Sequence, residues 1–201
     1  MAAILVEMGE TGATREADTR LQAGGLGACV GLCLYDSGVH AAVLVHIVLP
    51  QTLPASSFVG RLPHTPAPGK CADTAIPHAL AEIQKLGGQI SMVEAAIVGG
   101  AHIFTGGATD TAPVSRLEIG QRNVLAIKEA LMREGIPLSA EETGGQGGRT
   151  VSLDAATGGV WVRPVGLTER LLVTLGRVSG SKTTKAQSLT PNLEGALAYG
   201  L

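Results

Sequence analysis

Two nearly continuous apolar runs, residues 28–35 and 42–49, place the strongest constraint on the fold. A strand with one solvated face alternates apolar and polar residues, whereas an unbroken apolar run is typical of a strand buried on both faces. Further strands are predicted for residues 92–98, 150–153 and 160–165. The last two are separated by a glycine-containing loop and are expected to form a hairpin.

Two helices are predicted between these strands. Residues 73–86 place apolar side chains on one stripe, and residues 122–134 do the same. In the first helix, Thr74 as N-cap would put Pro77 at the third helical position, where its missing N–H has no intrahelical partner. Gly87 is a natural stop. The pattern predicts an α/β fold, a single-domain α/β sandwich with a mixed β-sheet and two main helices.

The composition excludes several functions. Aromatic residues are 2% of the 201, the net charge is −2 and no basic run occurs, which argues against binding to nucleic acid. No stretch approaches the ~18 apolar residues of a membrane span, so no membrane insertion is predicted. The first eight residues lack the pattern of a secretion signal, and a cytoplasmic location is expected. The folded domain is predicted over 1–165, and 166–201 form a C-terminal extension of unknown role.

The cysteines and histidines give no sign of a cofactor. Three cysteines, Cys29, Cys33 and Cys71, are too few and too scattered for a disulfide framework. The five histidines show no zinc-ligand spacing, so neither a metal nor another cofactor is predicted. Cys33 is expected in the core, and Cys71 at the surface or half-buried.

Cys29 is the candidate nucleophile. It follows the glycine-rich segment 24–27, which would give a substrate access to the thiol. The backbone N–H groups of Gly27, Ala28 and Cys29 could form an oxyanion hole for a reacting carbonyl. The alternative is that Cys29 is a small buried residue at the start of a strand.

His46 is the candidate base. It lies within an apolar strand, where an imidazole must find a hydrogen-bond partner or remain costly. It could activate a cysteine on a neighbouring strand and lower the pKa of that thiol. A core histidine with satisfied hydrogen bonds is the alternative.

A second polar concentration comprises Glu141, Glu142, glycines 144, 145, 147 and 148, and Arg149. It could be a loop near a metal or phosphate, or a solvated turn. It is not a P-loop, because the Gly-Lys-Ser/Thr ending is missing.

Together, these segments resemble the CheD family of chemoreceptor glutamine deamidases. Residues 25–30 (GLGACV) are similar to that family's Gly-Leu-Gly-Ser-Cys-Val signature, and His46 with Leu49-Pro50 resembles its His-x-x-Leu-Pro. Similar motifs follow in order from about residue 20 to residue 165: GKCADTA at 69–75, EAAIVGGA at 94–101, IGQRNV at 119–124, and Thr143-Gly144-Gly145 with Arg149.

The resemblance implies a Cys–His hydrolase that converts receptor glutamine side chains to glutamate through a thioester, with Cys29 as nucleophile and His46 as base. It also implies two partners, the cytoplasmic domain of a chemoreceptor as substrate and a CheC-type phosphatase. Beside the cysteine and the histidine, the family has a third site residue, a threonine six residues before the cysteine. Here Ala23 stands in its place, and Ala28 stands in place of the serine that precedes the cysteine.

The loss of the hydroxyl at position 23 raises the question of what orients His46. We expect a substitute, another hydroxyl or carbonyl from Thr19, Gln22 or the Glu142–Thr143 loop, because backbone carbonyls commonly orient histidines; the alternative is a slow enzyme whose binding role matters more. Two other functions stay open: a non-catalytic regulatory partner of the CheC-type phosphatase, and a different thiol hydrolase on the same fold.

Overall fold

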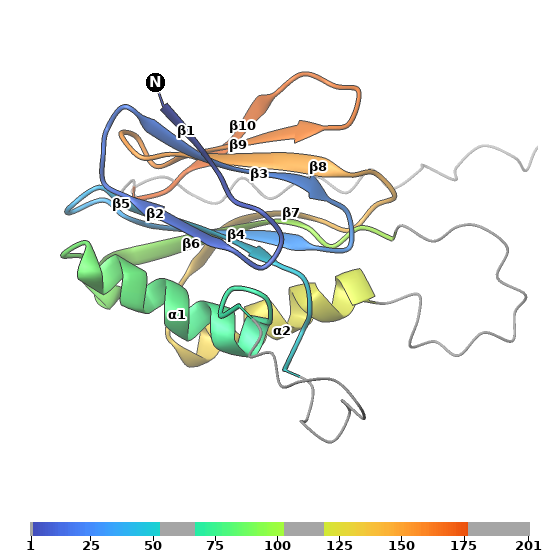
Figure 1. The fold of residues 1–201 in the computed structure, drawn as a ribbon, viewed down its shortest axis with the longest axis horizontal. Coiled ribbons are helices and arrows are strands. Elements are labelled where there is room, and N and C mark those ends of the chain that lie inside the picture. Colours follow the sequence, from blue (N-terminus) through green and yellow to red (C-terminus); the bar gives the residue numbers. More distant parts are fainter. Residues whose placement is uncertain (1, 53–66, 103–118, 177–201) are drawn as a thin grey trace, which may run out of the picture.

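The computed structural model describes residues 2–52, 67–102 and 119–176, which form two stacked β-sheets and a pair of helices (Figure 1). The outer sheet has the strand order β1-β3-β8-β9-β10, and the middle sheet has the order β2-β5-β4-β6-β7. The outer-sheet strands are β1 (Ala2–Leu5), β3 (Thr19–Leu26), β8 (Arg149–Asp154), β9 (Gly159–Pro164) and β10 (Arg170–Thr174). The middle-sheet strands are β2 (Thr11–Thr14), β4 (Val30–Asp36), β5 (Ala41–Ile47), β6 (Val93–Gly99) and β7 (Leu138–Thr143).

The middle sheet is buried on both faces, as the two apolar runs predict. All seven residues of β4 and all seven of β5 are buried. Alternate side chains point to opposite faces. Residues such as Val30, Leu32 and Leu34 pack with the helices, whereas Cys33 and Tyr35 pack toward the outer sheet.

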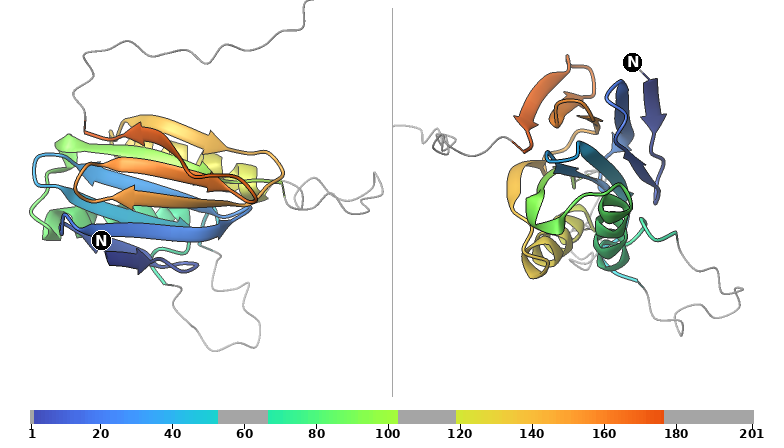
Figure 2. Two further views of the ribbon diagram at one scale, coloured as in Figure 1. Left: turned by 90° about the horizontal axis from the view of Figure 1, so that it is seen from above. Right: turned by 90° about the vertical axis from the view of Figure 1, so that its left-hand side faces the viewer.

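The helices α1 (Ala72–Lys85) and α2 (Ile119–Arg133) cover one face of the middle sheet, and the outer sheet covers the other (Figure 2). Both sheets are mixed, because β1 runs parallel to β3 and β6 parallel to β7, while the other pairs are antiparallel. The predicted α/β class is confirmed. Among the described residues, no helix has the length and apolarity needed to cross a membrane.

The predicted start of the first helix is wrong. Cys71, not Thr74, occupies the N-cap, and Pro77 lies inside the helix. The start is set by tertiary pairing, because Cys71 bridges to Leu49 and the N–H of Ala72 donates to the Leu49 carbonyl. Cys71 is also buried, with 2% of its surface exposed, rather than at the surface or half-buried.

Five strands have no counterpart in the sequence-based prediction: β1, β2, β3, β7 and β10. Most of them alternate weakly or are short. All four residues of β1 are exposed, and β10 has two exposed and three partly exposed residues. β10 follows residue 165 and pairs with β9.

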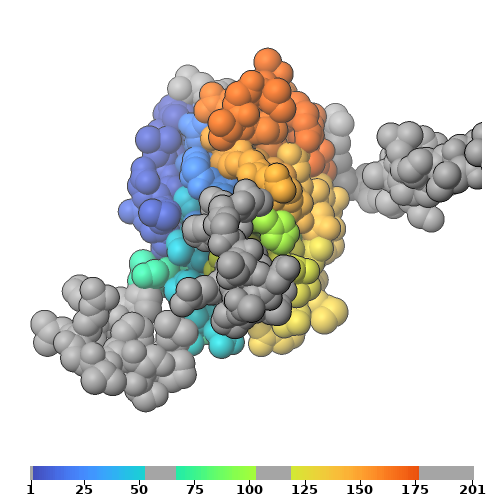
Figure 3. Space-filling model, turned by 90° about the vertical axis from the view of Figure 1, so that its right-hand side faces the viewer, coloured from blue at the N-terminus to red at the C-terminus, as the bar shows by residue number. Residues whose placement is uncertain are grey.

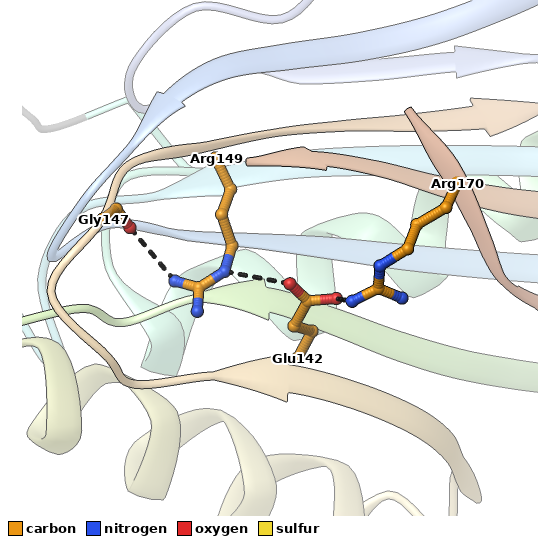
Figure 4. A network of polar contacts seen from close by, with 4 residues as sticks. All are labelled: Glu142, Gly147, Arg149 and Arg170. Carbon is orange, nitrogen blue, oxygen red and sulfur yellow. Dashed lines mark hydrogen bonds and ion pairs between the residues drawn. The ribbon is translucent and has the colours of Figure 1, made fainter. Parts of the chain in front are cut away.

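The polar concentration near residue 142 is an ion-pair network between the sheets (Figure 4). The Glu142 carboxylate lies 3.3 Å from Nε of Arg149 and also pairs with Arg170. Arg149 donates a further hydrogen bond to the Gly147 carbonyl at 3.2 Å. Glu142 belongs to the middle sheet and both arginines to the outer sheet, so the network links the two layers.

Candidate active site

Cys29 and His46 lie at the same end of the molecule and face the space between the sheets. His46 is paired with Gly31 across β5 and β4, and Cys29 is two residues before Gly31. This makes Cys29 and His46 diagonal neighbours, a relation that places Cα atoms about 7–8 Å apart in a regular antiparallel pair. Cys29 packs against the inter-sheet core. Figure 3 shows the molecule from the right-hand side of Figure 1, where blue N-terminal segments lie at one side and the orange C-terminal strands at the top.

The His46 ring is held by a backbone carbonyl. Its Nδ1 lies 3.3 Å from the carbonyl oxygen of Val6, and the side chain is 2% exposed. A carbonyl oxygen can only accept a hydrogen bond, so Nδ1 carries the proton. Nε2 is buried and has no hydrogen-bond partner within the described residues. Its lone pair is therefore available to accept a proton.

The charge state of His46 is governed mainly by burial. Burial lowers the pKa of the imidazole, while the Val6 carbonyl and the Glu7 carboxylate act in the opposite direction. The ordinary value is 6.5, so the ring is neutral at pH 7. A neutral ring with an unprotonated Nε2 is the form that a general base requires.

The segment that contains Val6 is anchored to both sheets. The N–H of Val6 donates to the Gln22 carbonyl of β3, and the N–H of Gly9 donates to the carbonyl of His46 itself. Ala23 is fully buried nearby in β3, opposite Val151, and offers no hydroxyl. The group that contacts the His46 ring is the backbone carbonyl of Val6, and not a group of Thr19, Gln22 or the Glu142–Thr143 loop, where a substitute for the hydroxyl was expected.

The thiol of Cys29 is protonated at rest. Its side chain is partly exposed, and burial raises its pKa from the ordinary 9.0, opposed by a hydrogen bond from its own backbone N–H. The expectation of a lowered pKa is wrong, because desolvation of the thiolate outweighs the available donors. The resting pair is therefore a neutral thiol and a neutral imidazole. Cys33 is fully buried, and burial also raises its pKa strongly.

The loop of residues 27–29 is fixed by its carbonyl groups. The Gly27 carbonyl accepts from the N–H of Ala101 at 2.7 Å, and the Cys29 carbonyl accepts from the N–H of Gly100 at 2.9 Å. The Ala28 carbonyl accepts from Nδ2 of Asn123 at 2.9 Å. All three carbonyls of the loop are therefore occupied.

Of the three N–H groups of this loop, only that of Gly27 donates to another residue in the described part of the chain. That of Gly27 donates to the Gly25 carbonyl at 2.8 Å. Those of Ala28 and Cys29 donate to no other residue in the described part of the chain. They are the available donors for an oxyanion at Cys29.

Glycine is required where this loop meets β6. Gly99 has φ +121°, and a Cβ there would lie 2.3 Å from the Cys29 carbonyl oxygen. Gly100 also has positive φ. Only glycine combines this backbone conformation with such close approach. The sequence shows no sign of the contact between these glycines and the loop that carries Cys29, nor of the roles of Val6 and Asn123 beside it.

The described residues include no group of three or more His, Cys, Asp or Glu side chains that could hold a metal ion. The site consists of one thiol, one imidazole and backbone groups.

Comparison with known proteins gives the family. A family model described as CheD chemotactic sensory transduction matches residues 52–164, more than half of the chain. The chain belongs to the CheD family. Several CheD proteins named "Probable chemoreceptor glutamine deamidase CheD" are similar to it over most of their length. The protein from Desulforamulus reducens is 43% identical over 71% of this chain and 79% of its own.

Two further CheD relatives are similar to this chain over most of their length. The Pyrococcus abyssi protein is 41% identical, over 70% of this chain and 79% of its own. The Syntrophomonas wolfei protein is 37% identical, over 78% of this chain and 90% of its own.

Proposed function

We propose that this protein is a glutamine deamidase that hydrolyses glutamine side chains in the cytoplasmic domain of chemoreceptors, with Cys29 as nucleophile and His46 as general base. The names of its relatives support the substrate, and the motif resemblance and the site geometry support the two residues. We therefore expect the protein to act in the cytoplasm, where that receptor domain lies.

The observation that carries the proposal is the protonation pattern of His46. Nδ1 donates to the Val6 carbonyl, and Nε2 is buried without a hydrogen-bond partner among the described residues, the Cys29 thiol included, so its lone pair is not engaged. A satisfied core histidine would have a partner for both nitrogens.

The reaction would start from the neutral pair. Nε2 of His46 takes the proton of Cys29 as Sγ attacks the glutamine carboxamide carbon, and the N–H groups of Ala28 and Cys29 receive the developing oxyanion. Protonated His46 then gives its proton to the leaving nitrogen as the C–N bond breaks, releasing ammonia and forming a thioester. Water, deprotonated by neutral His46, attacks the thioester, and the thiol is regenerated with glutamate as product.

A second function is favoured by one observation, the alanine at position 23. Without the hydroxyl of the family pattern, the protein could act as a non-catalytic regulatory partner of a CheC-type phosphatase. Titration with the cognate phosphatase tests this, and no binding at micromolar concentration would remove it.

The deamidase proposal is tested by mass spectrometry of a chemoreceptor cytoplasmic fragment after incubation with the protein. Each Gln-to-Glu conversion raises the mass by about 1 Da, because OH replaces NH₂. Cys29→Ala should abolish the shift, a loss of several orders of magnitude in rate. Cys33→Ala is the matched control and should retain activity. An unshifted fragment with wild-type protein, or a full shift with Cys29→Ala, would refute the proposal.

A further inference from the structure

Asn123 is a buried polar residue with no part in the reaction above. It lies on the first turns of α2 and is completely buried. Its Nδ2 donates to the Ala28 carbonyl at 2.9 Å and to the Val48 carbonyl at 3.0 Å. Ala28 precedes the nucleophile, and Val48 follows His46 by two residues.

The chemistry of these contacts fixes the orientation of the amide. Both partners are carbonyl oxygens, which only accept, so the NH₂ group must face them. An amide NH₂ has two hydrogens, and each is used once. Oδ1 is buried with no partner among the described residues. The side chain thus leaves its acceptor unsatisfied while both donors are engaged at the site.

The helix that carries Asn123 packs against residues 100 and 101, which hydrogen-bond to the loop of residues 27–29. A Cβ at Gly120 would lie 2.7 Å from the backbone of Gly100 and 2.8 Å from the Ala101 carbonyl oxygen, so the two segments are in direct contact. Gly100 and Ala101 hold the Cys29 and Gly27 carbonyls. The start of α2 is therefore packed directly against the residues that hold the loop, and Asn123 adds a side-chain bond from the same helix to the Ala28 carbonyl.

We propose that Asn123 is a positioning residue, which ties the nucleophile loop to the strand end that carries the base and so sets the Cys29–His46 separation and the direction of the Ala28 and Cys29 N–H groups. This inference rests on the proposed deamidase function. With the Ala28 carbonyl released, the loop would turn and its N–H groups would no longer converge on one oxyanion position.

The test compares Asn123→Ala and Asn123→Ser with Asp36→Ala. Asp36 is the matched control, because it is also buried and also bridges two backbone groups, accepting at 2.7 Å from the N–H of Gly38 and at 2.7 Å from that of Gln89. It ends β4 at the opposite end from Cys29. For Asn123→Ala, kcat should fall by about tenfold to a hundredfold at nearly unchanged KM, a loss typical of a misplaced reacting group. Asn123→Ser can donate one hydrogen bond and should lie between.

A second readout needs no substrate. Release of the loop exposes the Cys29 thiol, which removes part of the desolvation that raises its pKa. The pH midpoint of Cys29 alkylation should therefore move lower in both Asn123 variants, even as kcat falls, and should not move in Asp36→Ala. An unchanged kcat and midpoint in folded Asn123→Ser, or equal changes in Asp36→Ala, would overturn the proposal.

The two proposals fail separately. If wild-type protein does not deamidate but the alkylation midpoint moves only in the Asn123 variants, the function is wrong and the positioning role stands. If Asn123→Ala does not fold, Asn123→Ser decides.

Discussion

At the scale of single residues, the candidate site combines a thiol that resists deprotonation with an imidazole that resists protonation. Burial raises the pKa of Cys29 and lowers that of His46, so each is kept in its neutral form. A thiolate–imidazolium pair would need both shifts reversed. Cys29 therefore stays a protonated thiol before substrate binds. In the proposed reaction its proton passes to His46 only as the sulfur attacks the substrate.

This neutral pair predicts the pH dependence of activity. His46 must be unprotonated, and its folded pKa lies below 6.5, so the deamidation rate should hold constant as pH falls from 8 to 6.5 and decline only below that. Alkylation of Cys29 should instead keep rising beyond pH 9, because its thiolate forms only above the ordinary pKa. Rate profiles and peptide-mapped labelling measure both. A labelling plateau near pH 7 would indicate an ion pair instead.

The alanine at position 23 leads to a second prediction. Because the Val6 carbonyl already holds the His46 ring, Ala23→Thr should change the deamidation rate by less than about tenfold, or about 1.4 kcal/mol of barrier. Ala23 is fully buried, so the larger side chain should also reduce stability. Initial rates on one receptor fragment measure the first effect. A gain of a hundredfold would show that the site lacks an orienting hydroxyl and would favour the regulatory function.

Sequence reasoning could propose Cys29 and His46 because their side chains are chemically distinctive in apolar surroundings. It could not find Val6, whose contribution is a backbone carbonyl that every residue possesses. Asn123 has a distinctive side chain, but its two partners lie 75 and 95 positions away in the chain. Such contacts depend on tertiary packing, which no local pattern encodes.

At the scale of elements, the packing of the middle sheet against the outer sheet depends on a small residue, Gly31, which is paired with His46. A Cβ at Gly31 would lie 2.7 Å from Cγ1 of Val151 and 3.1 Å from Cδ1 of Leu26, both in the outer sheet. Gly31 therefore lets the two sheets approach closely next to His46.

Gly31→Ala should lower the free energy of unfolding by about 1–3 kcal/mol, the usual cost of overpacking a core. Gly24→Ala in β3 is the control, because the added methyl would have a single neighbour, Oγ1 of Thr150 at 3.7 Å. Urea unfolding of the two variants and the wild type measures the difference. Equal stabilities for the two variants would contradict the close packing at Gly31.

The elements that sequence predicted are those with a strong, continuous apolar pattern. The strands of the middle sheet around β4 and both helices have such patterns, because each buries a wide face. β1 and β10 were missed for the opposite reason: they are edge strands of the outer sheet with little buried surface. Their pairing depends on backbone hydrogen bonds to β3 and β9, which carry no side-chain signal.

At the scale of the whole molecule, the middle sheet separates two cores, one against the helices and one against the outer sheet. Cys29 packs at the margin of the second core, so the geometry of the candidate site depends on how the sheets are held together. A layered α/β sandwich was predictable from the alternation of strands and helices. The second sheet was not, since its strands come from both ends of the chain.

The Glu142 network gives a test of this coupling. Glu142 joins β7 to Arg149 and Arg170 across the sheets, and its side chain is 17% exposed, so solvent screens the pair with Arg149 only partly. Glu142→Gln keeps the size of the side chain but removes its charge. We expect a loss of about 1.5 kcal/mol in the free energy of unfolding, the low end of the range for hydrogen bonds to charged groups, because the Arg170 side chain is 56% exposed.

Glu82→Gln is the matched control for that substitution. Glu82 is 22% exposed and also has two basic neighbours, the Lys85 ammonium at 2.7 Å and the His78 ring at 4.0 Å, but all three residues lie on α1. Pairs within one helix contribute only about 0.2–0.5 kcal/mol each, so its loss should be small. Urea unfolding at low salt and at about 1 M NaCl measures both losses. At about 1 M NaCl the Debye length is near 3 Å, so the stability loss caused by Glu142→Gln should become smaller but should not vanish. Similar losses for the two variants would mean that the inter-sheet network adds nothing beyond a local ion pair.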